Sequence, residues 1–146
     1  MHLNSNEIAR LIPHRYPFAL VDRIDEVDET ARTIRGRKCI SVSDMTFCGH
    51  FPEHHVYPGV LLVEALAQCG CVLLMLEEKN RGKIPLFAGI NRMRFRRQVV
   101  PGDVVELEAA FTKEKAGLVF AKVRACVEGQ TVCEGEILCA LGEEHA

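Results

Sequence analysis

The sequence predicts an α+β fold in which one curved antiparallel sheet wraps around a long central apolar helix, at about residues 58–80. Two strand-like segments precede this helix and about four follow it. Their connections are too short for βαβ units, so we expect the strands to pair antiparallel. Apolar residues fall on nearly every side of the helix, which predicts burial all round. A sheet that curves around the helix satisfies both observations.

A short helix and a hairpin are expected before the central helix. Residues 4–12 suit a helix because Asn4 or Ser5 can cap its start. Residues 18–29 and 31–42 read as two strands separated by a polar turn, which favours a hairpin.

The central helix has a start signal, a stop signal and one acid inside an apolar run. Pro58 suits its first turn, and Gly82 follows a charged exit. The run from Val60 to Leu76 has 17 residues and contains Glu64 and Gln68. A membrane-spanning helix needs about 20 apolar residues and rarely holds an acid, so we expect a buried helix and no membrane insertion.

The rest of the chain reads as β-structure. Gly117 and Gly129 mark bends between strands, and the alternation of apolar and polar residues is clearest at 118–127. The expected strands lie at residues 85–100, 104–115, 117–129 and 131–141.

The composition indicates a globular chain, and we expect residues 1–146 to form a single domain. The chain is 48% hydrophobic and 26% charged, which suits a protein that buries a core. A net charge of −2 gives no general reason to bind nucleic acid, so an anionic partner needs a local basic patch. The N-terminus lacks the apolar segment of a signal peptide, so we expect a cytoplasmic protein.

The cysteines and histidines do not indicate a metal site. The seven cysteines include no Cys-x-x-Cys, and we interpret them as small thiols, mostly buried, in a reducing compartment. His50, His54 and His55 follow an H-x-x-x-H-H spacing that is not a usual ligand set, and no cysteine or carboxylate completes it. We therefore expect no metal.

Glu64 is the first candidate functional residue, because it lies inside an apolar helix. An exposed acid on a partly exposed helix is the alternative, but its immediate neighbours are apolar and favour burial. Desolvation raises the pKa of a buried carboxylate, which can then donate a proton near neutrality. Gln68 lies one turn later on the same face and could orient it.

A candidate base and a candidate oxyanion donor precede Glu64. His50 stands between Gly49 and Phe51, in a segment that implies a tight backbone. A histidine there suits a base, although one merely hydrogen-bonded within a turn is the alternative. Gly59 opens the helix, where unpaired N–H groups could polarise a carbonyl. Acid, base and donor within 15 residues indicate proton abstraction next to a carbonyl.

Three blocks of the sequence resemble the (3R)-hydroxyacyl-[acyl-carrier-protein] dehydratases of the FabZ class. They are "LIPHRYPFALVDRI" (11–24), "GHFPEHHVYPGVLLVEALAQ" (49–68) and "FAGINRMRFRRQVVPGD" (87–103), and the likeness extends over about residues 8–141. The resemblance implies the hot-dog fold and the removal of water from a 3-hydroxyacyl chain, giving a trans-2-enoyl product. It implies that acyl carrier protein delivers the chain on its phosphopantetheine arm, and that no metal or redox cofactor is needed.

The resemblance also implies roles for single residues. His50 matches the catalytic histidine, Glu64 the catalytic acid, and Gly59 the glycine whose N–H binds the thioester carbonyl. In this family the histidine and the acid of one site come from different subunits, which implies a homodimer with shared active sites. Trimers of dimers are common, so a hexamer is compatible. The related FabA class, which also isomerises the double bond, carries Asp where Glu64 stands, which favours a simple dehydratase.

The sequence departs from the family near the start of the helix. Glu53 stands where Gly is usual, His55 where Pro is frequent, and Tyr57 where Met is frequent. None of these changes removes a catalytic group. We expect Tyr57 to form the wall of the acyl tunnel or its gate.

Arginines gather in the third block. Arg92, Arg94 and Arg96 are expected on one face of a strand, with Met93 and Phe95 on the other. A solvated strand face is one interpretation. The other is a docking patch for the acidic carrier protein and the phosphate of its arm, with Arg94 and Arg96 as the candidate contacts.

Two other functions stay open at this point. A hot-dog acyl thioesterase would need a carboxylate that activates water, and the G-H-F-P block argues against it. A non-catalytic acyl-binding protein with this fold is the second alternative, and the presence of His50, Glu64 and Gly59 argues against that.

Overall fold

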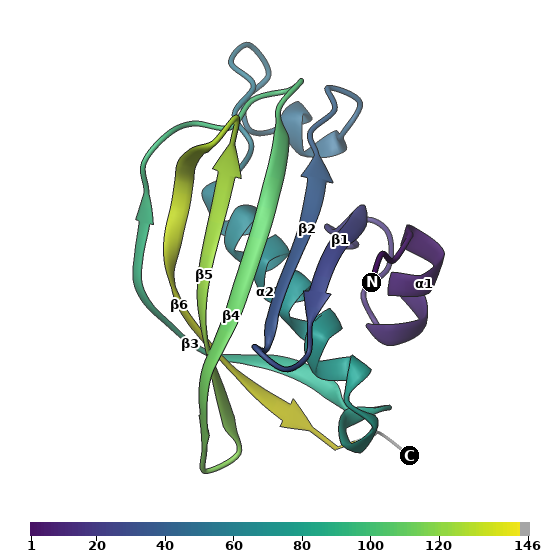
Figure 1. Ribbon diagram of the computed structural model, residues 1–146. Helices are drawn as coiled ribbons and strands as arrows, with labels where there is room; N and C mark the ends of the chain where they lie inside the picture. Colours follow the sequence, from purple (N-terminus) through teal and green to yellow (C-terminus); the bar gives the residue numbers. More distant parts are fainter. Residues whose placement is uncertain (144–146) are drawn as a thin grey trace.

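One antiparallel sheet curves around helix α2 (Gly59–Leu76), as Figure 1 shows. The computed structural model describes residues 1–143. Within them the strand order is β1-β2-β4-β5-β6-β3. The strands are β1 (Arg23–Asp28), β2 (Thr33–Cys39), β3 (Ile84–Phe95), β4 (Val104–Lys115), β5 (Leu118–Val127) and β6 (Gln130–Gly142). The predicted fold class is confirmed.

Only strands β4, β5 and β6 form a simple meander. Their two turns are Ala116-Gly117 and Glu128-Gly129, and all four residues have positive φ, as two-residue hairpin turns of type I′ require. Strand β3 instead pairs with β6 and forms the far edge of the sheet, so β2 pairs with β4. Helix α2 connects β2 to β3 and carries the chain from one side of the sheet to its opposite edge, which explains this order.

Helix α2 is shorter than predicted. It ends at Leu76, and a 3-10 turn, η2 (Glu78–Asn80), follows. The side-chain amide of Asn80 donates to the carbonyl oxygen of Leu74 at 3.0 Å and so satisfies the end of the helix. Pro58 is the N-cap residue. Although α2 is long and apolar enough to cross a membrane, 72% of it is buried, so it is the core helix of this fold.

The N-terminal part packs against the first edge of the sheet. Helix α1 (Ser5–Leu11) begins with Asn4 as N-cap, and Glu7 completes a capping box. Figure 1 shows α1 beside β1. The predicted strand at 18–29 forms only from Arg23, because the backbone of Phe18 and Leu20 bonds to the side chain of Gln68 on α2 instead of to the sheet.

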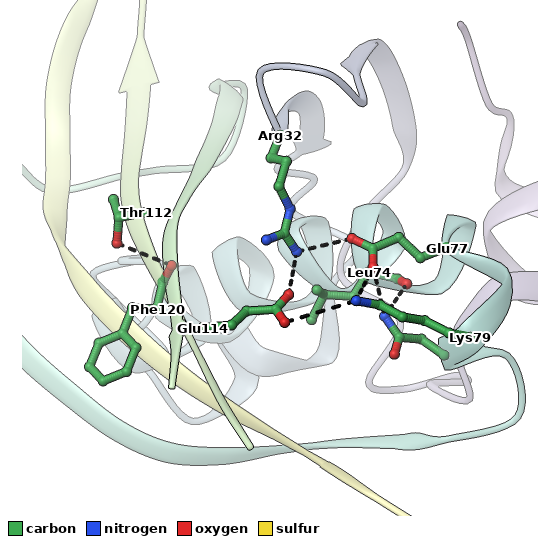
Figure 2. Close-up of polar contacts among 8 residues, drawn as sticks. Arg32, Leu74, Glu77, Lys79, Thr112, Glu114 and Phe120 are labelled. Carbon is green, nitrogen blue, oxygen red and sulfur yellow. Dashed lines mark hydrogen bonds and ion pairs between the residues drawn. The ribbon is translucent and has the colours of Figure 1, made fainter. Parts of the chain in front are cut away.

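Arg32 ties the end of α2 to the sheet (Figure 2). Its guanidinium donates to Glu77, just after α2, at 3.0 Å and to Glu114 on β4 at 2.6 Å. The same group lies 5.3 Å from the centre of the Phe111 ring. Arg32 has a φ of 55°, so these contacts hold a backbone conformation that non-glycine residues rarely adopt. The hydrogen bond from Arg32 lowers the pKa of Glu114.

Arg32→Ala is expected to lower the free energy of unfolding by about 1 kcal/mol at pH 7, because it removes a partly exposed bridge and a cation–π contact. The pKa of Glu114 is lower in the folded protein than in the unfolded chain. Its ion pair with Arg32 therefore contributes fully to the free energy of unfolding when the pH is above the unfolded-state pKa. That contribution is lost as the pH falls through the folded-state pKa. Urea unfolding at pH 7 and pH 3 should show the difference from wild type shrinking in acid.

Arg35→Ala is the matched control, since Arg35 and Glu26 form a more exposed pair with side chains 55% and 62% exposed. It should change the unfolding free energy little at either pH. If the unfolding free energy of Arg32→Ala fell short of the wild-type value by the same amount at both pH values, the effect could not come from the ion pair with Glu114.

Candidate active site

His50 lies in a closed loop between the 3-10 turn η1 (Met45–Cys48) and α2. Its Nδ1 is 2.6 Å from the carbonyl oxygen of Val56. A carbonyl only accepts, so Nδ1 carries the hydrogen and Nε2 has the free lone pair. The Val56 N–H donates to the His50 carbonyl at 3.2 Å, and the Phe51 ring stacks on the imidazole at 4.1 Å. These contacts orient the imidazole and leave Nε2 free to accept a proton.

The other histidines of this loop do not converge on His50. Phe51 and His54 exchange two backbone hydrogen bonds of 3.0 Å, and the His55 ring packs 5.4 Å from that of Phe47. Within residues 1–143 no group of three or more His, Cys, Asp or Glu side chains is arranged to hold a metal ion.

Glu64 projects from α2 with its side chain 15% exposed. Its Oε1 accepts from Nε2 of Gln68 at 2.9 Å. Gln68 is buried, and its own Oε1 accepts from the Leu20 N–H at 2.9 Å while its Nε2 also donates to the Phe18 carbonyl at 2.8 Å. A backbone N–H must face the amide oxygen, so the orientation of Gln68 is fixed and its N–H groups point to Glu64 and Phe18.

His14 is a residue beside Glu64 that sequence reasoning missed. Its Nε2 lies 3.5 Å from Oε1 of Glu64, and its Nδ1 is buried without a hydrogen-bond partner. Burial lowers the pKa of His14 more than the nearby Glu64 raises it, so the ring is neutral at pH 7. His14 stands between two prolines in the first quoted block, but no spacing relates it to a residue 50 positions later.

Gly59 is the first residue of α2, and Pro58 offers no capping side chain. The first N–H groups of the helix therefore have no partner within it, as an oxyanion donor requires. A Cβ at Gly59 would lie 2.7 Å from the Phe95 ring. Close packing of Phe95 is thus a second reason for glycine here, beside the approach of a carbonyl.

Tyr57 is 2% exposed and separates two grooves. One groove is lined by Gly59 and Phe95, the other by Phe18 and Leu61. The phenol oxygen is buried without a hydrogen-bond partner, and burial raises the pKa of Tyr57, so it stays a neutral O–H. A side chain packed in this way suits a fixed wall of the expected acyl tunnel better than a movable gate.

The predicted arginine patch lines a single groove. Arg92, Arg94 and Arg96 face it together with Lys122 and Arg124. Strand β3 bulges at this point and Arg92 has a φ of 50°, so regular alternation does not place the three side chains. Arg96 donates to Glu134 on β6 at 2.8 Å.

Within the described part of the chain, His50 and Glu64 do not contact each other. Glu64 contacts Gln68 and His14, whereas His50 contacts Val56 and Phe51. A single copy of the chain therefore holds His50 and Glu64 in separate surroundings.

Comparisons with known proteins agree on one family. The FabA-like domain family matches residues 12–136. The 3-hydroxyacyl-[acyl-carrier-protein] dehydratase FabZ of Clostridium perfringens is 45% identical over 140 residues, covering 96% of this chain and 99% of that protein. The FabZ of Bacillus velezensis is 50% identical over 141 residues, with coverages of 97% and 99%. The FabZ of Listeria monocytogenes serotype 4b is 50% identical over 141 residues, with 97% of both chains covered.

Solved structures share the fold. The dehydratase heterocomplex ApeI:P from Xenorhabdus doucetiae has a TM-score of 0.79 at 16% identity, covering 93% of this chain and 91% of its own. A hypothetical thioesterase with coenzyme A from Streptococcus pneumoniae TIGR4 has a TM-score of 0.61 at 12% identity, with coverages of 84% and 87%. At these identities the likeness shows the hot-dog fold alone.

Proposed function

This chain belongs to the FabA-like family, and from that premise we propose that it is a hydro-lyase that dehydrates (3R)-3-hydroxyacyl-acyl-carrier-protein to trans-2-enoyl-acyl-carrier-protein in fatty acid biosynthesis. The observation that carries the proposal is the 50% identity to FabZ of Bacillus velezensis over 97% of this chain and 99% of the relative. Because almost the whole of both chains aligns, the activity in the relative's name can be carried over as a whole.

The proposed chemistry uses acid–base catalysis. Nε2 of His50 takes the α-proton of the thioester, and the N–H of Gly59 stabilises the charge that develops on the carbonyl oxygen. The electron pair left by the α-proton forms the double bond between C2 and C3 as the C3–O bond breaks. Glu64 protonates the departing hydroxyl, which leaves as water. These steps move two protons and no redox electrons, so they need no redox cofactor, and the proposed roles are all filled by His50, Gly59 and Glu64 without a metal.

The working unit in this proposal is a homodimer whose sites combine His50 of one subunit with Glu64 of the other. Two observations support it. The two groups do not contact each other within the described chain, and β3 leaves an unpaired sheet edge with exposed apolar side chains. These side chains are Leu86, Phe87, Ile90 and Phe95. A hexamer built from three such dimers is compatible with this arrangement.

Acyl carrier protein is the proposed partner and the cytoplasm the proposed location. The basic groove with Arg94 would meet the phosphate of the phosphopantetheine arm, because guanidinium groups pair well with phosphate. Arg96 already pairs with Glu134, so Arg94 is the freer of the two candidate contacts. Neither nucleic acid nor membrane insertion has a part in this function.

The proposal is tested with 3-hydroxybutyryl thioesters of acyl carrier protein and of coenzyme A. We expect the absorbance of an enoyl thioester to rise with time, without release of free thiol. The matched control is the (3S) substrate, which should react far more slowly. Release of the free acid and thiol with no enoyl product would contradict dehydration and favour a thioesterase.

A further inference from the structure

Two side chains approach the same oxygen of Glu64. Nε2 of Gln68 lies 2.9 Å from Oε1, and Nε2 of His14 lies 3.5 Å from that same atom. Neither contact involves Oε2. The two oxygens of this carboxyl group therefore have different surroundings.

His14 lies beside Glu64 as a neutral ring. Two charged groups act on its ring, Glu64 from α2 and Arg15 from its own segment, and burial outweighs the attraction of Glu64. The Phe18 ring stacks beside the imidazole, with 6.4 Å between the ring centres and 28° between their planes. Since the carboxylate oxygen accepts, the neutral ring places its hydrogen on Nε2 and leaves the buried Nδ1 with a lone pair.

We propose that His14 is a positioning residue that, together with Gln68, holds Oε1 of Glu64 as an acceptor, so that Oε2 carries the proton and delivers it to the departing hydroxyl. This inference rests on the proposed function of Glu64. Oε1 accepts from Gln68 and is the carboxyl oxygen that lies 3.5 Å from Nε2 of His14, so in this arrangement the single proton of the acid resides on Oε2. When the O–H bond at Oε2 breaks, the charge left on the carboxylate is shared with those donors. The 3.5 Å contact shortens at that moment, as catalytic hydrogen bonds of free enzymes commonly do.

Three substitutions of His14 separate this role from packing. The amide nitrogen of Gln reaches the place of Nε2, that of Asn reaches the place of Nδ1, and Phe keeps a ring without a donor. We expect His14→Gln to stay within about 3-fold of the wild-type kcat. His14→Asn and His14→Phe should lose about 10-fold or more in kcat with little change in KM, since a hydrogen bond to a charged group is worth about that factor.

The split between kcat and KM and a double-mutant cycle give readouts that packing alone would not change. A loss confined to kcat, restored in His14→Gln, points to the reacting acid and not to substrate binding. In a Glu64→Gln background, His14→Asn should add no further loss.

Wild-type kcat in His14→Phe would overturn the proposal. So would equal losses in His14→Gln and His14→Asn with a matching fall in the unfolding temperature, which would assign His14 to packing. The proposed function has a separate test in Glu64→Gln with His14 intact. Normal turnover in that variant would show that Glu64 is not the acid.

Discussion

His50→Ala is expected to lower kcat for dehydration by at least about 100-fold, because it removes the general base. The imidazole is held by the Val56 carbonyl on Nδ1, so only Nε2 can take the α-proton. Water in the vacated space has no such fixed orientation and is a far weaker base. The measurement is enoyl thioester absorbance with a 3-hydroxybutyryl carrier substrate, with circular dichroism to check the fold.

His54→Ala is the matched control for His50→Ala. His54 lies in the same loop but is exposed, and its backbone rather than its ring closes the loop through Phe51. It should keep activity within about 3-fold of wild type. Near-normal turnover in His50→Ala would contradict the assignment of the base.

Glu64→Gln tests the acid in the same assay. The amide has the shape of the carboxyl group and can still accept from Gln68, but it carries no acidic proton. We expect the same loss of at least about 100-fold with an unchanged unfolding temperature. Together the two substitutions show whether both groups act in one reaction.

Features of the fold that depend on neighbouring residues could be predicted from sequence. The N-cap Asn4, one of the two caps expected, and the turn glycines Gly117 and Gly129 act within a few positions, and the structure places them as expected. The end of α2 could not be predicted, because Asn80 reaches back to the Leu74 carbonyl over a 3-10 turn. The late start of β1 depends on Gln68, about 50 positions away in the chain.

The candidate site also has residues that a short stretch of sequence reveals and others that only the fold brings together. His50, Gly59 and Glu64 lie within one short segment whose pattern indicates chemistry, so they stand out as candidates in the sequence. His14 comes from a distant segment that the bonds of Gln68 hold against α2. Its role depends on a contact that only the fold creates. The unpartnered phenol of Tyr57 is likewise visible only once the packing around it is known.

Mixing the two inactive variants is expected to restore activity. If each site takes its base from one subunit and its acid from the other, a heterodimer of His50→Ala and Glu64→Gln has one site with both groups and one with neither. Random pairing of equal amounts makes half of the dimers mixed, each with one of two sites intact, so about a quarter of the wild-type activity should return. Each variant alone stays at about 1% or less.

The experiment unfolds the two variants together in urea, dilutes them to reassemble the subunits, and measures enoyl thioester formation. The control mixes His50→Ala with a chain that carries both substitutions, since no pairing of these chains gives an intact site. If one subunit supplied both groups of a site, every subunit in the first mixture would have one defect and activity would stay at the level of the single variants. The exposed apolar edge of β3, which includes Leu86 and Ile90, is the surface expected to bring the subunits together.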